Sequence, residues 1–403
     1  MSNVLIFSEE YTKVTKGMCV VWTNHACETS KDRRVQVLLN AEHWAFEETR
    51  DLFGENAQVT VHRLPLLLPS SVLKRIFEAC DPVWVLRASR FMFGQLLDLL
   101  FSPLIVFYLF ARLRRARLSA VFSHNGGWPA GRLCRWIIVA AMLAGVPKRI
   151  LIIHSHPAHP VRLLQLPFRL MQARLMDRCA TSIVTVSDSV KAALESGVFR
   201  SPVLRIHNGL KLTRSVRGTG RYVRPLEWTP SGVTVGFVGA IYPYKGLHVL
   251  LDAFRLVEVP CELALLGPAD RRYLRFLQLQ AEVCANKVSF LGFHEDVEAF
   301  MQRIDVLVVP SIALESFSMV ILEAMKHRKP VICSSFGGMK EVVEDGVTGL
   351  VVPAGDKAAL ADAMKTVLAD RNMRVAMGEA GYHRLKKLFT AERMAAQYEQ
   401  LLS

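Results

Sequence analysis

Two glutamates eight positions apart are the first residues in the 403-residue sequence whose types and spacing could do chemistry. The stretch SIALESFSMVILEAM (311–325) places Glu315 in a polar segment and Glu323 in an apolar run. The preceding DVLVVPS has the pattern of a buried strand and VILEAMK that of a helix, so we expect Glu315 in the loop and Glu323 about two turns into the helix. At 1.5 Å per residue, the two are then separated by roughly 10 Å along the helix axis.

A separation of this size decides between two kinds of chemistry. The acid and base of a glycoside hydrolase lie roughly 5–9.5 Å apart, so these carboxylates suit one extended ligand bound at two places better than hydrolysis. Each carboxylate can accept two hydroxyl hydrogen bonds, which predicts contacts to a ribose and a hexose. Between them, the amides of Phe317, Ser318 and Met319 would point at phosphates from the N-terminus of a helix. By spacing alone, a pair of ordinary surface glutamates is the alternative.

A lysine in a second loop could complete such a site. In GAIYPYKGLHVLLDAF (239–254) a strand ends at Gly239, and Lys245 and Gly246 open a helix. We expect this lysine to face a crevice between two domains and to neutralise a diphosphate as a point charge. The alternative is a solvated lysine, but the N-terminal end of a helix disfavours a cation unless an anion is bound there.

The first half of the chain offers glycines and histidines at the ends of predicted strands. Gly17 is expected between the first strand and the following helix, where it would let phosphate approach the backbone closely. The loops SHNGGWPAG (123–131) and IIHSHPAHP (152–160) bring four histidines toward one predicted crevice: His124, His154, His156 and His159. Their spacing does not match that of catalytic zinc motifs, so we expect no metal site. The pair Asn208-Gly209 predicts a left-handed turn.

These loops must be positioned by short apolar strands that alternate with helix-like segments. Ten strands are expected, at 4–7, 35–39, 120–124, 149–154, 182–187, 233–239, 262–267, 288–292, 305–311 and 330–335. Fully apolar strands alternating with helices predict parallel sheets covered on both faces, and two such series predict two doubly wound, Rossmann-like α/β domains. We place the first domain at 1–212, a polar linker rich in Gly, Pro and Arg at 213–231, and the second domain at 232–382.

The net charge of +14 is unevenly distributed along the chain. Residues 1–224 carry 31 Lys and Arg against 15 Asp and Glu, whereas residues 225–403 carry 19 against 21. Such asymmetry suggests that the first half meets a polyanion or an anionic membrane, with a solubilising surface as the simpler alternative.

Two basic-apolar segments make the membrane interpretation more specific. The apolar run 96–110, followed by RLRRAR (112–117), is short for a transmembrane helix. We expect either a buried helix or a surface element with apolar side chains in the acyl boundary and arginines on anionic headgroups. Residues 161–178 repeat the mixture. The expected membrane-binding segments are therefore 96–117 and 161–178.

The cysteines and the N-terminus bear on the compartment. The eight cysteines form no CxxC pair and lie mostly in apolar runs, which is typical of reduced residues in a cytosolic protein. The opening MSNVLIFSEE has no basic segment followed by an apolar one. We expect a cytoplasmic protein, peripheral at the inner face of the plasma membrane.

Taken together, these segments resemble the retaining GT-B glycosyltransferases of family 4, the glycosyl transferases group 1. The resemblance rests on the E-x7-E element in ESFSMVILEAM, the VVPS before it, the KG turn, and FGGMKEVVEDGVTGLVVPAGD after it. HNG (207–209), VSDSVKAAL (186–194) and GFHEDV (292–297) are similar to the family as well, and HSH and HNGGWPAG to its bacterial polysaccharide branch. The similarity covers nearly all of the chain and is strongest over 182–400.

The resemblance implies two Rossmann-like domains facing across a cleft, with a role for each candidate in the second. Glu323 would bind the ribose hydroxyls, Lys245 the diphosphate and Glu315 the transferred sugar. The other donor-binding residues of the second domain would be Gly239, Phe293, Phe317, Ser318, Met319 and Val320, with Phe293 near the nucleotide base. Gly17 would contact the diphosphate from the first domain.

The resemblance also implies roles in the first domain. His154 would act with Glu315 at the transferred sugar. The acceptor side would include Asn125, Gly126 and His156. The C-terminal helix, 383–403, would pack back on the first domain.

Two departures from the family pattern stand in the donor site. The family usually has an arginine where this chain has Ala240, so one of two expected diphosphate cations is missing, and either another basic residue substitutes or donor binding is weaker. The usual glycine after Glu-Ser-Phe is Ser318 here, which narrows the space beside the backbone amides that would receive the phosphates. Family members retain the anomeric configuration without a metal or cofactor, and the absence of Asp-x-Asp agrees with this. The leaving phosphate assists the incoming hydroxyl on the same face, so no separate catalytic base would be required.

The function implied is transfer of a hexose from a nucleotide-diphosphate sugar to a glycan or lipid-linked acceptor in cell-surface polysaccharide synthesis, such as lipopolysaccharide, O-antigen or capsule. A basic nucleic-acid-binding protein is a rival because the pI is about 9.6, but no nucleic-acid motif occurs and we expect no such partner. A dehydrogenase is disfavoured because no G-x-G-x-x-G follows the strands beginning at Val4 and Val233. A catalytically weak nucleotide-sugar-binding protein remains an alternative because of Ala240 and Ser318.

Overall fold

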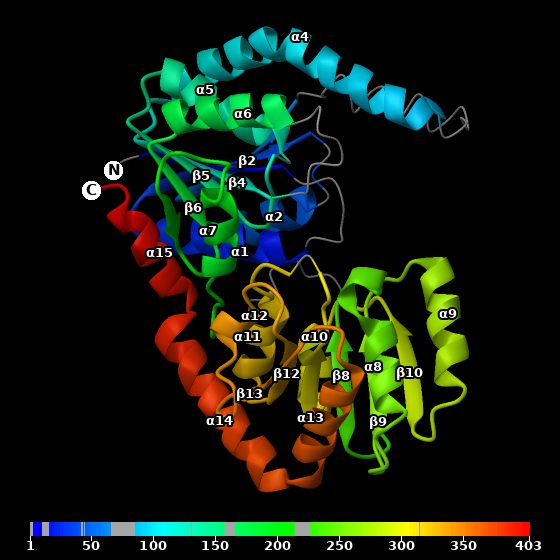
Figure 1. Ribbon diagram of the computed structural model, residues 1–403. Coiled ribbons are helices and arrows are strands. Elements are labelled where there is room, and N and C mark those ends of the chain that lie inside the picture. Colours follow the sequence, from blue (N-terminus) through cyan, green and yellow to red (C-terminus); the bar gives the residue numbers. More distant parts are fainter. Residues whose placement is uncertain are drawn as a thin grey trace. The chain divides into compact units, whose positions relative to one another are not determined.

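The computed structural model describes residues 3–9, 16–41, 43, 45–65, 85–129, 131–157, 166–213, 226–313 and 315–403. The chain forms two compact units, each built on one sheet (Figure 1). Unit 1 comprises Met1–Thr185, Ala193–Leu204 and Gln397–Ser403. Unit 2 comprises Val186–Ala192 and Arg205–Ala396.

Unit 1 has a seven-stranded sheet in the order β3-β2-β1-β4-β5-β6-β7 (Figure 1). Its strands are β1 (Asn3–Ser8), β2 (Arg34–Asn40), β3 (Val59–Leu64), β4 (Ala120–Asn125), β5 (Lys148–Ile153), β6 (Ser182–Thr185) and β7 (Val203–Arg205). The central β1 and β4 are almost wholly buried, which explains their apolar runs without alternation. Parallel pairing sets Ser8 opposite His124 and Asn125 opposite Ile153, so the carboxyl ends of β1, β4 and β5 meet at one edge.

Helices connect these strands and cover the sheet: α1 (Lys16–Thr29), α2 (Phe46–Phe53), α4 (Val85–Ala116), α5 (Arg132–Leu143), α6 (Leu166–Cys179) and α7 (Asp188–Glu195), of which the first five residues belong to unit 2. The sequence of α5, RLCRWIIVAAML, is apolar on most sides because the helix is packed between α4 and strands β4 and β5 (Figure 1). Among the described helices, none has the length and apolar character needed to cross a membrane.

Unit 2 has a six-stranded sheet in the order β10-β9-β8-β11-β12-β13. Its strands are β8 (Thr234–Val238), β9 (Glu262–Leu266), β10 (Lys287–Gly292), β11 (Val306–Val309), β12 (Val331–Ser334) and β13 (Gly349–Val352). All five pairings between them are parallel.

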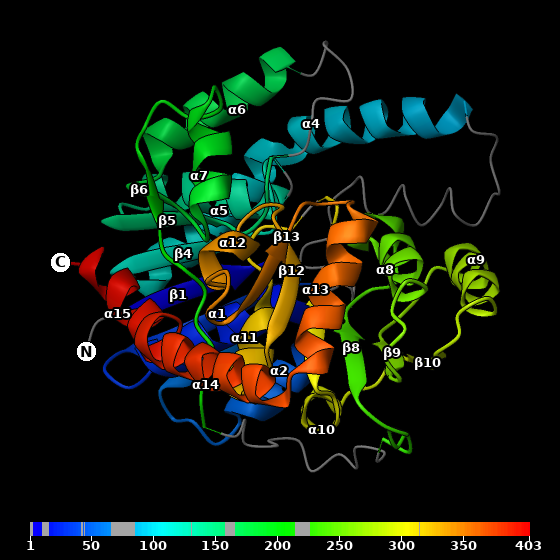
Figure 2. The same cartoon turned by 60° about the horizontal axis from the view of Figure 1, so that its bottom comes forward.

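The helices of unit 2 surround this sheet: α8 (Leu247–Phe254), α9 (Arg271–Ala281), α10 (Val297–Arg303), α11 (Met319–Lys326), α12 (Met339–Val342), α13 (Lys357–Ala369), α14 (Arg371–Leu388) and α15 (Ala391–Gln400), of which the end belongs to unit 1. Helices α8 and α13 pack against each other on one face, where Leu250, Leu251 and Met364 join a fully buried core with the strand residues (Figure 2). Helix α14 packs on α11.

The predicted fold class of two doubly wound parallel sheets is confirmed, and all ten expected strands lie in these sheets. Three strands were not predicted: β3, β7 and β13. Each is at an edge of its sheet, where only part of the strand is buried, so the sequence lacks a continuous apolar run. Of the predicted linker, residues 214–225 lie outside the described residues.

Candidate functional site

A lysine and a glutamate meet in unit 2 where two neighbouring strands end. Lys245 ends the 3-10 turn η3 (Pro243–Lys245) that follows β8, and Glu315 lies in the loop after β11, the neighbour of β8. The Lys245 Nζ is 2.5 Å from Glu315 Oε2, and the Ser311 hydroxyl donates to the same oxygen at 3.1 Å. The side chains are 20% and 10% exposed, so the pair is largely shielded from water. The structure thus brings two of the predicted site residues together.

The two loops are held to each other by backbone contacts. The carbonyl of Tyr244 accepts hydrogen bonds from the amides of Ile312 at 3.0 Å and Ala313 at 3.3 Å. Gly246 has φ 72°, and a Cβ placed on it would lie 2.0 Å from the carbonyl oxygen of Pro310. Only glycine satisfies both the left-handed conformation and the close approach. The sequence Lys-Gly therefore fixes the lysine beside the end of β11.

The helix that carries the second glutamate begins later than predicted. Helix α11 starts at Met319, so Glu323 is its fifth residue, a little over one turn from the start, and the expectation of two turns is wrong. The residues from Glu315 to Ser318 form an irregular segment because Ser318 has φ 68° and ψ 86°, which stops the helix from extending backwards. The roughly 10 Å helical spacing therefore does not apply. Glu323 is half-buried.

The segment before α11 packs against aromatic rings and against the FGG segment. The buried Phe317 ring lies 5.3 Å from the His207 ring and 5.7 Å from that of Phe389. A Cβ on Gly338 would lie 2.1 Å from the Ser316 carbonyl oxygen, so this glycine permits close approach of the FGG segment to the segment with Glu315. Backbone amides at the start of α11, near Met319 and Val320, have no helical acceptor and carry the positive end of the helix dipole.

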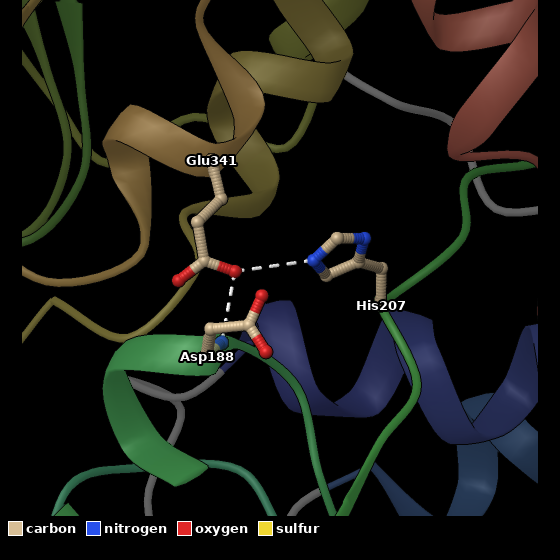
Figure 3. A group of neighbouring side chains, drawn as sticks. All are labelled: Asp188, His207 and Glu341. Carbon is tan, nitrogen blue, oxygen red and sulfur yellow. Dashed lines mark hydrogen bonds and ion pairs between the residues drawn. The ribbon is translucent and has the colours of Figure 1, made fainter. Parts of the chain in front are cut away.

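His207 connects this packing to a polar network (Figure 3). Glu341 in α12 accepts hydrogen bonds from the amides of Asp188 at 2.9 Å and Ser189 at 3.0 Å, and its Oε2 lies 3.2 Å from His207 Nε2. Arg205 joins Asp188 at 3.0 Å and His207 at 2.9 Å. Burial would raise the pKa of Glu341, but the hydrogen bonds from His207 and the two amides lower it below its usual range.

Asp188, His207 and Glu341 form the one group of three potential metal ligands found among the described residues, with ligand atoms within 4.8 Å of one another (Figure 3). The Arg205 guanidinium lies 2.9 Å from both ring nitrogens of His207, and a fixed cation there opposes a metal ion. The carboxylate of Glu341 is already used on the first turn of α7. We assign this group the structural role of binding α7 to the turn at His207.

The turn at Asn208-Gly209 differs from its prediction. Neither residue has positive φ, so the expected left-handed turn is wrong. Glycine is needed here for another reason, since a Cβ on Gly209 would lie 2.3 Å from the carbonyl oxygen of Thr390. Leu210 and Phe389 are joined by a backbone hydrogen bond of 2.9 Å at the same place.

The other donor-site candidates are spread along the same strand ends of unit 2. Gly239 follows β8 with φ 151°. A Cβ placed on Gly267 would lie 1.8 Å from the carbonyl oxygen of Gly239. Ala240, at the position where the family has arginine, is buried. Phe293 follows β10 and is 45% exposed, as an aromatic platform would be.

In unit 1 the predicted residues gather at the carboxyl edge of the sheet. His124 and Asn125 end β4, and His154 follows β5 with its amide donating to the Asn125 carbonyl at 2.9 Å. A Cβ on Gly127, the residue after Gly126, would lie 3.5 Å from the His156 carbonyl oxygen, so the two loops are adjacent. His159 lies outside the described residues.

Gly17 is not in a loop as predicted. Helix α1 begins at Lys16, which places Gly17 in the first turn of the helix. The contact of Gly17 with a phosphate stays a prediction, and residues 10–15 before the helix lie outside the described residues.

Four functional or supporting residues were not predicted: Glu9, His25, Arg205 and Glu341. Glu9 accepts from the amides of Leu133 at 2.8 Å and Cys134 at 3.3 Å and so caps α5, as Glu341 does α7. Glu9 follows a predicted strand, which was a usable signal. His25 lies in the middle of helix α1, away from any strand end, so the sequence carried no signal that it belongs to a site.

Comparisons with known proteins agree with this arrangement. Residues 223–384 match the family model described as Glycosyl transferases group 1. A phosphatidyl-myo-inositol mannosyltransferase of Mycobacterium leprae is 37% identical over 178 residues, covering 42% of this chain and 46% of that protein. A lipopolysaccharide core biosynthesis glycosyltransferase, LpsE of Rhizobium meliloti, is 31% identical over 200 residues, covering 48% and 58%. The chain thus spans about half the length of these relatives.

A solved structure extends the comparison to the full fold. Anabaena HepE in complex with UDP-glucose has a TM-score of 0.70 at 20% identity, covering 100% of this chain and 99% of that one. The family match contains Lys245, Glu315 and Glu323, and the two parallel sheets are those of the GT-B fold. The match to the glycosyl transferases group 1 thus covers residues 223–384, which lie in unit 2.

Proposed function

We propose that this protein is a retaining hexosyltransferase that moves a sugar from a nucleotide-diphosphate sugar to a glycan or lipid-linked acceptor in cell-surface polysaccharide synthesis. The family match and the names of the relatives, which act on phosphatidyl-myo-inositol and in lipopolysaccharide core synthesis, support this class of reaction. The complex of HepE with UDP-glucose makes uridine nucleotides the first donors to test.

The observation that carries the proposal is the ion pair of Lys245 and Glu315. A diphosphate needs a cation, and a sugar ring needs an acceptor for its hydroxyls; here both charges stand 2.5 Å apart at the end of neighbouring strands. A bound donor would replace part of this pairing, with its phosphate on Lys245 and its sugar hydroxyls on Glu315.

The remaining residues complete the donor site. The amides from Phe317 to Val320 would receive the phosphates at the positive end of α11 and compensate for Ala240. Glu323 would accept from the ribose hydroxyls, Gly239 would let the phosphates approach, and the exposed Phe293 would lie near the base.

Catalysis in this proposal needs no metal ion. Lys245 and the amides at the start of α11 neutralise the charge of the leaving diphosphate, which is the work a divalent cation does elsewhere. That diphosphate then assists the acceptor hydroxyl on the same face of the sugar, which retains the anomeric configuration. Unchanged transfer in excess EDTA is the expected result.

Binding and transfer test the proposal separately. Thermal unfolding with UDP, GDP, ADP and dTDP and their sugars should show one nucleotide that raises the Tm, since a ligand at 100 times its Kd stabilises by about 2.7 kcal/mol. Lys245→Met should remove most of this shift, whereas Lys365→Met, in an exposed pair with Asp362, should not. Glu323→Ala should weaken nucleotide binding, and Glu315→Ala should abolish transfer while binding persists.

Two results would count against the proposal. One is the absence of a shift with every nucleotide, and the other is a Lys245→Met variant that binds like the unmodified protein. A protein that binds a donor but transfers nothing to any glycan or lipid acceptor would favour the weak nucleotide-sugar-binding alternative, which Ala240 and the strained Ser318 support.

We further propose that the protein is cytoplasmic and binds the inner face of the plasma membrane through α4. Leu100, Leu104 and Phe107 lie on one face of this helix and are 64–68% exposed, with Phe101 and Tyr108 beside them. The opposite face, with Leu109 and Leu113, is buried. An outward apolar face that ends in the exposed Arg114 and Arg115 suits the acyl boundary and the headgroups of an anionic membrane.

Vesicle binding tests this surface. The double variant Leu104→Ser and Phe107→Ser should lose co-sedimentation with phosphatidylglycerol-containing vesicles. The control is Phe276→Ser and Leu279→Ser on α9, where both side chains are comparably exposed in unit 2. Each of Arg114→Ser and Arg115→Ser should weaken binding about fivefold, because one basic residue at such a surface contributes about 1 kcal/mol. Equal binding by the α4 and α9 variants would refute the role of α4.

A further inference from the structure

Three buried imidazoles form a hydrogen-bonded row in unit 1. His25 Nδ1 lies 3.2 Å from His124 Nε2, and His124 Nδ1 lies 2.9 Å from His154 Nε2. The rings come from α1, β4 and the end of β5, and are 0%, 0% and 8% exposed. The row therefore leads from the carboxyl edge of the sheet, at His154, into the interior of the unit.

The inner end of the row is enclosed by aromatic rings. His25 stacks on Tyr398 at 4.4 Å and meets Phe122 edge to face at 4.7 Å. Its Nε2 is fully buried and has no hydrogen-bond partner in the part of the chain that the structure describes. At the outer end, His154 Nδ1 has no hydrogen-bond partner among the described residues.

All three rings are neutral near pH 7. Burial lowers the pKa of His25 to about 3 and that of His154 to about 4, and it holds the pKa of His124 well below its usual range. A neutral imidazole has one N–H donor and one bare nitrogen. The tautomers of the row are therefore coupled, and only two arrangements satisfy both internal hydrogen bonds.

The two arrangements differ at the ends of the row. If His154 Nε2 donates inward, His124 must donate from Nε2 to His25, and His25 Nε2 becomes a buried N–H without an acceptor. If His25 Nδ1 donates outward, the unpartnered atom is a bare ring nitrogen instead. A buried donor without an acceptor is the rarer and more costly defect in proteins. The outward arrangement is therefore favoured.

We propose that His25 and His124 are positioning residues that fix His154 as an outward hydrogen-bond donor at Nδ1. His154 would then recognise an oxygen acceptor, such as a ring or hydroxyl oxygen of the transferred sugar, and would not act as a base toward a hydroxyl proton. This inference rests on the proposed function for the identity of the ligand. The arrangement of the protons does not depend on it.

Nitrogen NMR tests the proton arrangement directly. In the full-length protein labelled with 15N-histidine, long-range 1H–15N correlations distinguish Nδ1–H from Nε2–H rings, and loss of signals in single variants assigns them. We expect His124 and His154 to carry Nδ1–H at pH 7. An Nε2–H ring at His154, or a cationic one, would overturn the proposal.

Matched variants test the positioning role. His124→Leu should release the tautomer of His154 and lower kcat/KM for transfer about tenfold, the effect of one misplaced hydrogen bond. His124→Asn retains a donor where Nδ1 stood and should restore most of the activity. His43→Leu removes another buried histidine of unit 1, outside the row, and should leave the NMR pattern of His154 unchanged.

The two proposals fail in different ways. Nucleotide binding, measured by calorimetry, should be the same for His124→Leu and the unmodified protein because its determinants lie in unit 2. A protein with the expected tautomers but no transfer to any acceptor would refute the proposed function and leave the proton arrangement intact. Full transfer by His124→Leu would refute the positioning role.

Discussion

The carboxyl edges of the two sheets differ in charge. At the carboxyl ends of the unit 2 strands, Lys245 and Glu315 form an ion pair. At the same edge of unit 1, His124 and His154 are neutral because burial without a counter-charge disfavours the imidazolium. One fold thus presents an ion pair at one sheet edge and neutral rings at the other, depending on whether each buried group has a counter-charge.

Backbone approach separates the two edges as well. In unit 2, Gly246, Gly267 and Gly338 each allow a carbonyl oxygen within about 2 Å of where a Cβ would stand. At the carboxyl edge of unit 1, Gly126 has no neighbour within 4 Å of that point, and the nearest neighbours of Gly127 lie at 3.5 Å. Unit 2 therefore depends on backbone packing at its loops, and substitutions there should have the largest effects.

The largest effect is expected for Gly246→Ala. The added Cβ would meet the Pro310 carbonyl at 2.0 Å and would take φ 72°, so the loop with Lys245 must shift. We expect a loss of about 3 kcal/mol in the free energy of unfolding, together with loss of nucleotide binding. Gly292→Ala is the control, because φ is 68° with open space around the Cβ, and strain alone should cost about 1 kcal/mol. Equal losses in chemical denaturation would contradict the role of the close approach.

Acid should destabilise unit 1 before unit 2. Burial lowers the pKa values of His25 and His154 to about 3 and about 4. The free energy of unfolding of unit 1 is therefore at its full value above pH 6.5, and it decreases as the pH falls below 6.5 because the unfolded chain takes up protons that the buried rings do not. One such ring contributes a loss of about 2 kcal/mol by pH 5.

Unit 2 has its own acid-sensitive group, the fully buried Glu262. Burial raises its pKa, but hydrogen bonds from Ser289, Trp228 and Ser231 lower it to about 2, so its contribution is complete above pH 4.5 and is lost toward pH 2. Hydrogen exchange at pH 7.5 and 5.0, corrected for intrinsic rates, should show a larger loss of protection in β4 and β5 than in β8 and β9, because burial lowers the pKa of one described histidine of unit 2, His327. An equal loss in both sheets would contradict the comparison.

A smaller effect is expected for Glu341→Gln. The substitution keeps the shape but removes the negative charge from the amides of Asp188 and Ser189 at the start of α7, which should cost about 1–2 kcal/mol. Glu344→Gln breaks an exposed pair with Arg384 in the same segment and should cost less than about 1 kcal/mol. Thermal unfolding of both variants checks the difference, and equal Tm values would reject the capping role.

The smallest effect is a gain in stability from Ser318→Gly. Serine at φ 68° carries backbone strain that glycine does not, and its removal should raise the free energy of unfolding by about 1 kcal/mol. Part of this gain is offset because glycine increases the conformational entropy of the unfolded chain. Ser335→Gly, at a residue without positive φ, should lose stability instead. The check is denaturant titration of both variants. Changes of the same sign in their free energies of unfolding would count against backbone strain at Ser318.

Much of the fold could be predicted because its central strands are buried on both faces. Stretches such as VLIF in β1 and DVLVV around β11 must be apolar throughout, which is a strong local signal. The edge strand β3, with the sequence VTVHRL, is exposed at several positions and gave no such signal. The same reasoning identified Lys245 and Glu315, since polar residues directly after buried strands mark the ligand edge.

What the sequence by itself determined is ten of the strands, the fold class and which side chains end those strands, because each depends on residues close together in the chain. The tertiary structure alone decided the partners: His25 with His124, 99 positions away, and Glu341 with Asp188, 153 positions away. The order of strands in a sheet sets which distant residues meet, and that order is not encoded in any local pattern. For the same reason the neutral row in unit 1 and the cap on α7 could be found only in the folded molecule.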